Sequence, residues 1–455
     1  MTGSPVFDSV LIANRGEIAL RILRACRALG LRVVAAYSDA DRDAPHLALA
    51  DMAICIGPAV AARSYRDQAA LLSAALATGA GAIHPGYGFL AENAAFAARV
   101  AAAGLVFVGP PPQAIRIMGD KIAAKAAMQA AGVPCVPGSE GALPEDPEAV
   151  ARIARHVGFP VIVKAAGGGG GRGMRVVRDA ASLADSVALT RQEAMQAFGD
   201  PALYLERFLA HPRHVEVQVL CDDHGAALWL GARDCSLQRR HQKLVEEAPP
   251  PGLAPGEIAA IGARCADACR RIGYRGAGTF EFLYQDGAFA FIEMNTRLQV
   301  EHPVTEETTG IDIVVEQLRV ARGERLSIRQ DDIRTDGHAI ECRVNAEDPD
   351  TFAPSPGMVG SWSPPGGPGI RVDSHLCAGT RVPPHYDSLV AKIVARGATR
   401  AQALARMRQA LDETRIGGIS TNLPLLRTLI ADPDFVIGGV DIHHLERGLA
   451  ERRDG

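Results

Sequence analysis

Residues 159–177 read FPVIVKAAGGGGGRGMRVV, which joins two β-branched runs through five consecutive glycines. The runs at 160–163 and 176–177 predict a strand, a glycine-rich turn and a second strand. The glycines cost backbone entropy and bury no side chain, but they let the backbone approach a ligand and direct several N–H groups at it. A polyphosphate would also meet the cations of Lys164 and Arg172. The stretch predicts a phosphate-holding flap, and a plain surface loop is the alternative.

Two better-known phosphate-binding motifs do not fit this stretch. A Walker A loop needs Gly-Lys-Ser or Gly-Lys-Thr at the start of a helix, whereas residues 172–174 read RGM. A dinucleotide-binding fingerprint needs G-x-G-x-x-G opening a helix, whereas the residues that follow the glycines here predict a strand. We therefore expect any phosphate to be held by a flap between two strands.

The overall composition is that of a soluble globular protein, since 47% of the 455 residues are hydrophobic and 22% are charged. A chain of this length forms about two to four packing units. The net charge of -4 provides no basic field for nucleic acid. No apolar run is long enough to span a bilayer, and no targeting segment is recognisable. Nine cysteines without a CxxC pair suit a reducing compartment, so we expect a cytoplasmic protein with neither a nucleic-acid nor a membrane partner.

Strands and helices alternate through the first 110 residues. Strands are expected at 9–13, 32–37, 53–56, 82–83 and 106–108, and helices at 18–29, 68–77 and 93–103. This alternation predicts an open parallel sheet with helices on both faces. Ligands of such sheets lie at the carboxyl ends of the strands, where the segment HPGYGF (84–89) stands. That segment is either a binding loop or a turn with an aromatic anchor.

From residue 214 onward the pattern becomes antiparallel. His214, Glu216 and Gln218 alternate with apolar residues, so they share one face of a strand, and a solvated face is the default interpretation. The segment RDCSLQRRHQK (233–243) is expected to be a loop that is too charged to be buried without a ligand. A single helix is expected at 308–322.

Two strands expected at 279–284 and 289–295 carry a candidate metal site. Glu281 interrupts an otherwise apolar strand, and Glu293 and Asn295 lie on one face of the next. Two carboxylates and an amide carbonyl that converge on one point suit a hard cation such as Mg²⁺.

The register of this hairpin decides whether the two glutamates converge. A two-residue turn would pair Glu281 with Ile292 and send Glu293 to the opposite face. A three-residue loop, with Gly287 as a left-handed bulge, would put both glutamates on the same face. The metal interpretation therefore predicts the three-residue loop.

The segment TRLQVEHPV (296–304) follows the second strand directly. Arg297, Gln299 and Glu301 alternate along it, so that one cation and one carboxylate point the same way. An internal salt bridge would explain this pattern. Beside a metal and a phosphate flap, we instead expect an anion site with a nearby base.

Eight segments of the chain resemble those of the biotin carboxylase family, the ATP-grasp subunits of acetyl-CoA and related acyl-CoA carboxylases. The segments are HPGYGFLAEN (84–93), MGDK (118–121), KAAGGGGGRGM (164–174), PRHVEVQV (212–219), RDCSLQRRHQKLVEEAP (233–249), GTFEF (278–282), IEMNTRLQVEHPVTE (292–306) and AIECRVNAEDP (339–349). The resemblance runs from about residue 10 to 445.

The resemblance implies an ATP-grasp fold with both α/β and α+β parts. Its domains would be an N-terminal Rossmann-like domain (1–119), an ATP-grasp linker with the glycine-rich flap (120–208), the C-terminal catalytic part of the ATP-grasp unit (209–330) and a C-terminal biotin carboxylase domain (331–450). The implied reaction joins ATP and bicarbonate into carboxyphosphate, which then carboxylates the ureido nitrogen of biotin.

The resemblance also implies the site residues by position. ATP would be bound by Lys121, Lys164, Gly170, Gly171, Met174, Glu206, Arg207, Phe208, Leu209, His214, Gln238 and His241. Mg²⁺ or Mn²⁺, as two ions, would be held by Glu281, Glu293 and Asn295. Bicarbonate would be held by Lys243, Arg297, Gln299 and Val300, with Glu301 as the base that deprotonates it. Biotin would lie by Tyr87, Arg343 and Asp387, and Arg343 would stabilise its enolate-like charge.

The implied partners are a biotin carboxyl carrier protein and carboxyltransferase subunits, because no Ala-Met-Lys-Met biotinylation motif occurs in the chain. Biotin is then a carrier-bound substrate that is not attached to this chain. The family also suggests a homodimer, with Arg21 and Arg24 as possible interface residues, although exposed helix arginines are the default. Arg207 and Phe208 depart from the Lys and Tyr associated with those positions, which matters little if the hinge uses backbone groups.

Three alternatives remain open. The chain could serve a propionyl-CoA, methylcrotonyl-CoA, pyruvate or 2-oxoglutarate carboxylase, since the carboxyltransferase chooses the acceptor. It could be another ATP-grasp ligase such as carbamoyl phosphate synthetase, although Arg343 and a lone ATP-grasp unit argue against this. A non-catalytic nucleotide-binding regulatory subunit would need a broken site, whereas all the charged residues named above are present.

Overall fold

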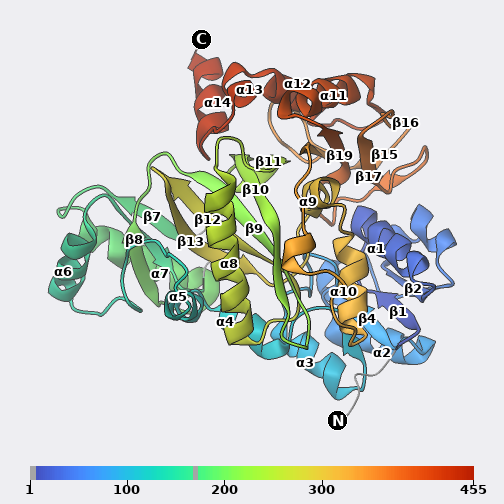
Figure 1. Ribbon diagram of the computed structural model, residues 1–455, viewed down its shortest axis with the longest axis horizontal. Coiled ribbons are helices and arrows are strands. Elements are labelled where there is room, and N and C mark those ends of the chain that lie inside the picture. The colour runs from blue at the N-terminus through green and yellow to red at the C-terminus, as the bar shows by residue number, and fades with distance from the viewer. Residues whose placement is uncertain (1–6, 168–172, 455) are drawn as a thin grey trace.

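The computed structural model describes residues 7–167 and 173–454, with the backbone alone for 452–454. Figure 1 shows the N-terminal sheet (blue) and the flap (teal and green) at opposite ends of the molecule, with the C-terminal helices (red) along the top. In the described part of the chain, every helix is too short or too polar to cross a lipid bilayer.

The N-terminal part is a five-stranded parallel sheet in the order β3-β2-β1-β4-β5. Its strands are β1 (Ser9–Ile12), β2 (Arg32–Tyr37), β3 (Met52–Cys55), β4 (Ala82–His84) and β5 (Val106–Phe107). The main helices are α1 (Gly16–Ala28), α2 (Gln68–Thr78) and α3 (Ala94–Ala102). The predicted open parallel sheet is therefore confirmed, and its central strand β1 is buried along its whole length, as a strand covered on both faces must be.

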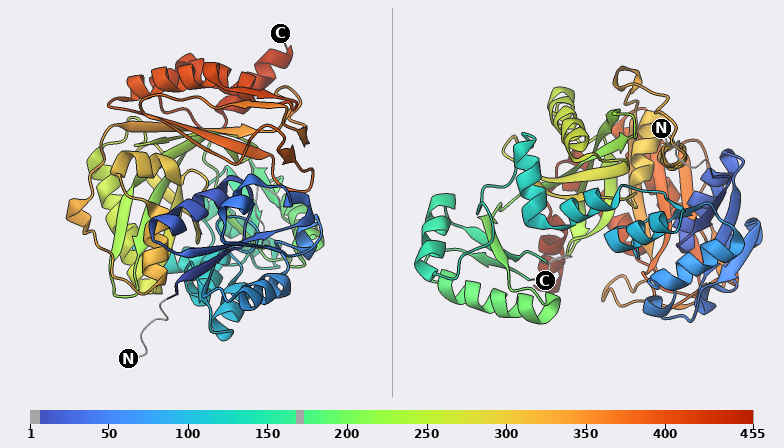
Figure 2. Two further views of the ribbon diagram at one scale, coloured as in Figure 1. Left: turned by 90° about the vertical axis from the view of Figure 1, so that its right-hand side faces the viewer. Right: turned by 90° about the horizontal axis from the view of Figure 1, so that it is seen from below.

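The flap is a small separate layer with its own core. Its antiparallel sheet has the order β7-β6-β8, and helices α4 and α5 connect it to the N-terminal part. The elements are α4 (Pro112–Gly119), α5 (Lys121–Ala130), α6 (Pro147–Val157), β6 (Val161–Ala165), β7 (Met174–Val177), α7 (Leu183–Phe198) and β8 (Leu203–Arg207). The predicted strand–turn–strand is confirmed on either side of the glycines, since β6 pairs antiparallel with β7. In the right-hand view of Figure 2 the flap projects away from the body of the molecule.

An eight-stranded sheet forms the centre of the molecule, in the order β13-β12-β9-β10-β11-β14-β19-β17. Its strands are β9 (Arg213–Cys221), β10 (Ala227–Arg239), β11 (Gln242–Ala248), β12 (Gly276–Gln285), β13 (Ala288–Asn295), β14 (His338–Asn345), β17 (Ile370–Ser374) and β19 (Leu389–Gly397). The sheet therefore continues from the catalytic half into the C-terminal part without a break. The loop expected at 233–243 is wrong, because these residues end one long strand and begin the next, with a tight turn at Arg240 and His241.

Helices cover the faces of this sheet. They are α8 (Pro255–Ile272), α9 (His302–Thr309), α10 (Ile313–Ala321), α11 (Arg400–Glu413), α12 (Leu423–Ala431), α13 (Pro433–Ile437) and α14 (His444–Asp454). The single helix expected at 308–322 is wrong, because Gly310 ends α9 in the left-handed conformation and a new helix begins at Ile313. Short strand pairs, β15 (Gly357–Met358) with β18 (Arg381–Val382) and β16 (Ser361–Ser363) with β20 (Arg415–Gly417), close the C-terminal part.

Candidate active site

The hairpin of β12 and β13 brings two glutamates together by a route that differs from the expected one. The turn has two residues, 286–287, both with positive φ, so the predicted three-residue loop is wrong. Ile292 is instead the extra residue of a β-bulge, and beyond it Glu281 pairs with Glu293. The bulge shifts the register by one residue and puts both glutamates on the same face.

Three polar side chains with oxygen atoms lie at this bulge. Asn295 Nδ2 donates to Glu281 Oε1 at 2.7 Å, and Glu293 lies directly across the ladder from Glu281. Burial, and then repulsion by Glu281, raise the pKa of Glu293. Two carboxylates and an amide oxygen form the donor set that a hard divalent cation prefers.

Two cationic side chains lie beside these oxygen atoms. Arg297 Nη2 donates to Asn295 Oδ1 at 2.7 Å, and Lys121 Nζ lies 3.7 Å from Glu293 Oε2. These cations partly offset the negative charge that a bound metal would neutralise. The two carboxylates paired across the ladder fit a divalent ion, and the amide oxygen of Asn295 would have to leave Arg297 to join them.

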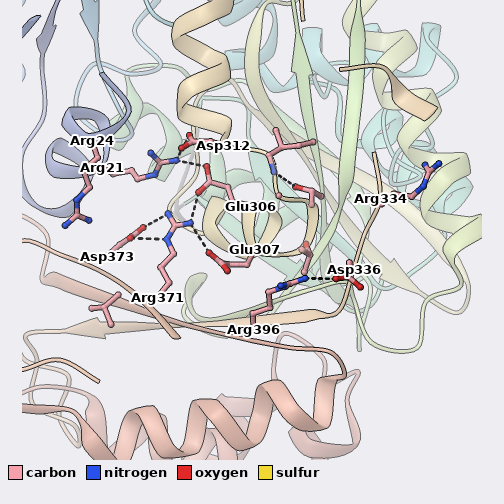
Figure 3. A pocket seen from close by; sticks show the side chains of 15 residues that line it. Arg21, Arg24, Glu306, Glu307, Asp312, Arg334, Asp336, Arg371, Asp373 and Arg396 are labelled. Carbon is pink, nitrogen blue, oxygen red and sulfur yellow. Dashed lines mark hydrogen bonds and ion pairs between the residues drawn. The ribbon is translucent and has the colours of Figure 1, made fainter. Parts of the chain in front are cut away.

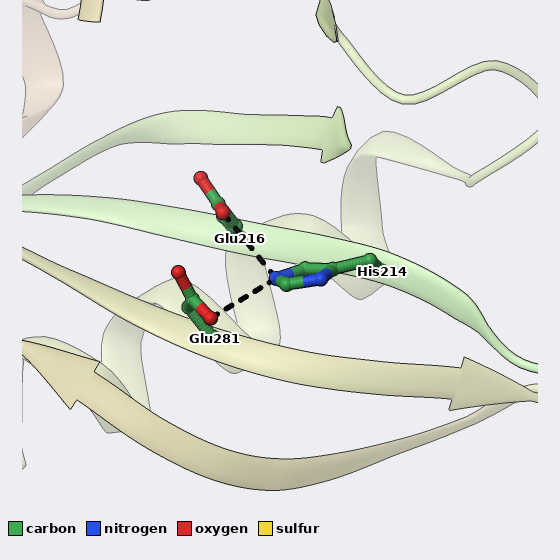
Figure 4. Close-up of side chains that lie close together, drawn as sticks. All are labelled: His214, Glu216 and Glu281. Carbon is green, nitrogen blue, oxygen red and sulfur yellow. Dashed lines mark ion pairs between the residues drawn. The ribbon is translucent and has the colours of Figure 1, made fainter. Parts of the chain in front are cut away.

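His214, Glu216 and Gln218 point into the protein, so the solvated face expected for them is wrong. His214 Nε2 lies 3.3 Å from Glu216 Oε1 and 3.2 Å from Glu281 Oε2 (Figure 4). Burial opposes the charged form of His214, but Glu281 and Glu216 outweigh burial and raise the pKa of His214 to about 9. The imidazole is therefore a cation at neutral pH.

Arg233 on β10 supplies the partners of this buried polar face. Its side chain is fully buried and donates to Glu216 Oε2 at 3.0 Å, to Gln218 Oε1 at 2.7 Å and to Gln299 Oε1 at 2.5 Å. Internal ion pairs and hydrogen bonds thus satisfy charges that we expected to need a ligand or solvent.

Lys243 on β11 joins the metal-site residues to the segment before α9. Its Nζ donates to Glu281 Oε1 and to Glu301 Oε1, each at 2.9 Å, and also contacts Glu216. Burial opposes the charge, but the three carboxylates raise the pKa of Lys243 well above its ordinary value. This ammonium is a fixed positive charge at the centre of the site.

Glu301 lies between two cations at the start of α9. Its Oε1 receives Lys243, and its Oε2 accepts from Arg343 Nη2 at 2.9 Å. Burial opposes ionisation, but Lys243 and then Arg343 lower the pKa of Glu301 below its ordinary value. Arg343 Nε also donates to Glu246 Oε1 at 2.5 Å, which fixes the guanidinium. Glu301 is therefore ionised and can accept a proton.

The internal salt bridge considered for Arg297 and Glu301 does not form between these two residues. Arg297 Nε donates to Glu92 Oε2 at 2.9 Å, after β13 has ended at Asn295. The turn that follows separates the two side chains along the site. Arg297 thus lies on the metal side of the site and Glu301 on the Arg343 side.

The flap residues on the predicted nucleotide side form one ion cluster. Lys164 Nζ donates to Glu206 Oε2 at 2.8 Å, and Lys125 Nζ donates to Glu206 Oε1 at 3.1 Å. Met174 stands opposite Lys164 on the neighbouring strand. Gly170 and Gly171 lie outside the described residues.

The hinge after β8 leaves one backbone donor available. The N–H groups of Arg207 and Phe208 donate to Pro137 O at 2.7 Å and to Pro160 O at 2.9 Å. Within the described ranges, no residue accepts from the N–H of Leu209. A ligand at the hinge would meet that N–H group, which agrees with a hinge that uses its backbone.

Two further predicted nucleotide residues lie on the hairpin that carries Lys243. Gln238 is buried near the end of β10 and pairs with Lys243 across the ladder. His241 lies in the turn, on the exposed side. These residues therefore extend from the central cations toward the rim of the site.

The HPGYGF segment is a tight turn held from inside the N-terminal sheet. Asn14 Nδ2 donates to Pro85 O at 2.6 Å and to Tyr87 O at 2.7 Å. Arg343 and Asp387 are the other residues predicted for biotin, and both lie close enough to Tyr87 to act on its pKa: Arg343 lowers it and Asp387 raises it. The Tyr87 hydroxyl contacts Glu17, and burial followed by that carboxylate raises the pKa of Tyr87 well above its ordinary value.

Several residues of the site were not predicted. Arg233, Glu216, Glu246 and Glu92 appeared in the sequence only as parts of charged, alternating or family-like segments, and Glu17 and Lys392 gave no signal. The charged run of β10 and β11 was the available signal. Its partners lie on strands far away in sequence, so the run was interpreted as a loop.

Family models match the chain in three consecutive stretches. The biotin carboxylase N-terminal domain matches residues 6–115, the ATP-binding domain of the carbamoyl-phosphate synthase L chain matches 120–329, and the biotin carboxylase C-terminal domain matches 341–447. A biotin carboxylase from Pseudomonas aeruginosa is 62% identical over 98% of this chain and 99% of its own length. The chain belongs to the biotin carboxylase family. It is an ATP-dependent ligase with an ATP-grasp fold.

Solved structures of the family superpose on nearly the whole chain. A biotin carboxylase-beta-gamma-ATP complex from Campylobacter jejuni matches with a TM-score of 0.93 and 47% identity, over 97% of this chain and 99% of that chain. A biotin carboxylase domain dimer of the Hydrogenobacter thermophilus 2-oxoglutarate carboxylase, with MgADP, ADP and bicarbonate, matches with a TM-score of 0.92 and 47% identity, over 97% and 98%. The ATP-binding stretch thus matches a domain named for carbamoyl-phosphate synthase, whereas the stretches on either side of it match biotin carboxylase domains.

Proposed function

We propose that the chain carboxylates biotin on a separate carrier protein, with ATP and bicarbonate as co-substrates and carboxyphosphate as the intermediate. This is the first half-reaction of an acetyl-CoA or related acyl-CoA carboxylase. The observation that carries the proposal is the position of Glu301, which is ionised and held between Lys243 at 2.9 Å and Arg343 at 2.9 Å. An anion clamp and a base are adjacent there, beside a metal-type donor set.

Phosphoryl transfer to bicarbonate depends on positioning and charge more than on covalent help. Glu281, Glu293 and Asn295 would hold Mg²⁺ or Mn²⁺, as two ions, which supply Lewis-acid neutralisation of phosphate charge. Lys121 and Lys164 would contact the phosphates, with the Gly170 and Gly171 backbone. Met174, Glu206 to Leu209, His214, Gln238 and His241 would line the rest of the nucleotide site.

Bicarbonate would lie against Lys243, Arg297, Gln299 and the backbone of Val300. As one bicarbonate oxygen attacks the γ-phosphorus and ADP leaves, the bicarbonate proton passes to Glu301. Arg233 holds Gln299 in place at 2.5 Å, and the surrounding carboxylates raise the pKa of Lys243 well above its ordinary value, which favours its charged form. The chain's own residues therefore supply both the base and the charges that stabilise the developing dianion.

Biotin would lie on the Arg343 side, bordered by Tyr87 and Asp387. As carboxyphosphate splits into CO₂ and phosphate, the phosphate would take the proton of the ring nitrogen, which then bonds to the carbon of CO₂. The Arg343 guanidinium would stabilise the negative charge that the ureido oxygen carries in between. Glu246 fixes Arg343 at 2.5 Å. Carboxyphosphate is labile to water, which supports a flap that closes over it.

ATP hydrolysis by the purified chain, with Mg²⁺ and bicarbonate and with or without free biotin, tests the proposal. We expect a rate that requires both bicarbonate and biotin. Hydrolysis that is indifferent to biotin would contradict the proposal and would favour another bicarbonate ligase. The acceptor of the holoenzyme, acetyl-CoA or an alternative such as the 2-oxoglutarate named in a solved relative, depends on the carboxyltransferase.

We also propose that the chain forms a homodimer, in addition to its encounters with the carrier and the carboxyltransferase. A polar cavity of about 780 Å³ lies between α1, the α9–α10 connection and β17 (Figure 3). Arg21 lines it and is buried, so the exposed-arginine default is wrong for this residue; it donates to Glu306 at 2.8 Å and to Asp312 at 2.6 Å. Arg24 stays exposed at the rim.

The cavity is lined by five arginines and five carboxylates, so the same surface on a second copy is complementary to it. Arg24→Glu should shift the chain from dimer to monomer in light scattering at micromolar concentration. A variant that remains fully dimeric would place the interface elsewhere.

A further inference from the structure

A buried lysine lies beneath the segment that we assign to bicarbonate. Lys392 on β19 is fully buried, and it stands opposite Arg343 on β14 and Asp373 on β17. Its Nζ donates to Val300 O at 2.9 Å and lies 3.2 Å from Glu17 Oε1. Asp373 Oδ2 lies farther away, at 3.8 Å.

A lysine in this position needs an explanation, because an apolar side chain of similar length would be buried more cheaply. Neutralising Glu17 and Asp373 would account for the charge of Lys392. It would not account for the hydrogen bond to Val300 O, which fixes the backbone immediately before Glu301. Lys392 therefore holds the bicarbonate segment in addition to balancing buried carboxylates.

Glu17 connects this lysine to the opposite side of the site. It lies in the first turn of α1 and is buried, and its Oε1 receives both the Tyr87 hydroxyl and Lys392. A continuous chain of contacts therefore runs from the Tyr87 hydroxyl through Glu17 and Lys392 to Val300 O. It joins the N-terminal sheet to the catalytic segment through the C-terminal part.

We propose that Glu17 and Lys392 are positioning residues that couple the biotin side of the site, at Tyr87, to the bicarbonate side, at Val300 and Glu301. The inference rests on the proposed function, which assigns those two sides. A movement of Tyr87 when biotin binds is transmitted through the ion pair to the carbonyl of Val300. Because coupling between two ligands is reciprocal, bicarbonate must in turn favour biotin binding.

Lys392→Met removes the charge and the donor while keeping an unbranched chain. We expect the stimulation of bicarbonate-dependent ATP cleavage by free biotin to fall about tenfold, with a similar rise in KM for bicarbonate. KM for ATP should stay within about twofold, because the flap residues do not contact this chain of residues. Unchanged biotin stimulation in folded Lys392→Met would overturn the inference.

Tyr87→Phe tests the other end of the chain, since it removes only the hydroxyl that meets Glu17. We expect the same loss of stimulation, and little further loss when it is combined with Lys392→Met. Additive losses would mean that the two residues act separately, and would overturn the coupling. Should Lys392→Met fail to fold, Lys392→Arg and Tyr87→Phe carry the same test.

Two controls separate coupling from a structural role. The double variant Glu17→Gln, Lys392→Met removes both charges. Its melting temperature should be higher than that of Lys392→Met alone, whereas its stimulation by biotin should stay as low. Arg400→Met breaks another buried ion pair, with Glu247 at 2.6 Å, and should lower the melting temperature while leaving stimulation intact. Regained stimulation in the double variant would overturn the inference. A wild-type chain without any biotin stimulation would instead refute the proposed function itself.

Discussion

Replacing Glu301 by Gln tests the assignment of the catalytic base. The carboxylate receives Lys243 on one oxygen and Arg343 on the other, each at 2.9 Å. A glutamine amide offers one oxygen and one NH₂ group, so one of the two cations would face a donor. Loss of one charge-assisted hydrogen bond predicts a fall of about 1.5–3 kcal/mol in the free energy of unfolding.

The effect on turnover should be larger than the effect on stability. Loss of a general base lowers the rate by about 10²–10⁴-fold. The nucleotide side should be nearly unaffected, because Lys164 and Glu206 bind each other at 2.8 Å in the flap and do not contact Glu301. We therefore expect turnover to fall by that factor while ATP affinity changes by less than about threefold.

The assay pairs ATP cleavage, with bicarbonate and biotin, with calorimetric titration of ATP. Glu247→Gln is a matched control, since Glu247 is buried on the same strand as Lys243 but pairs with His338 and Arg400 on the opposite face. It should lose stability and keep turnover. A loss of ATP affinity in Glu301→Gln as large as its loss of turnover would refute the reasoning.

Three further predictions concern other parts of the molecule. Arg343→Ala should impair carboxylation of free biotin at least tenfold more than bicarbonate-dependent ATP cleavage, measured by product formation and by ADP release; equal losses would argue against its role at the biotin oxygen. Glu293→Gln removes one of the two carboxylates that are paired across the β12–β13 ladder, so Mg²⁺ dependence of turnover should shift to at least tenfold higher concentration, and an unchanged dependence would exclude Glu293 as a ligand. Burial lowers the pKa of His46 from 6.5 to about 4, because the buried imidazole disfavours its charged form. The neutral imidazole therefore contributes its full share to the free energy of unfolding above pH 6.5, and this share is lost as the pH falls toward 4. The free energy of unfolding should therefore drop by about 2 kcal/mol more between pH 7.5 and 5 in the wild type than in His46→Gln, as urea titrations would measure; parallel curves would contradict this.

The sequence pattern correctly predicted those helices and strands that depend mainly on neighbouring residues. The alternation of β1, α1 and β2 follows from residues within one or two turns, and the structure has these elements within two residues of the expected ends. The left-handed Gly310 that divides α9 from α10 was visible in the sequence, but a continuous apolar pattern outweighed it.

The rest depended on partners far away in sequence. Glu216 was predicted on the correct strand, but its burial depends on Arg233 and Lys243, which come from two other strands. The side of the sheet on which Glu293 lies depends on a β-bulge at Ile292. No glycine or other turn residue at this position indicates the bulge in the sequence. Pairing between distant strands decides such features, so strand propensity alone gives no register.

The continuous central sheet affects how the chain folds during synthesis. Strand β11 ends at Ala248, and its neighbour β14 begins only at His338, about 90 residues later. At about 5–20 residues per second, the ribosome needs roughly 5–18 s to deliver that partner. During this interval β11 is an open edge that carries the central lysine of the site. A nascent chain therefore passes through a stage in which its catalytic hairpin presents an unpaired edge to chaperones and to other chains.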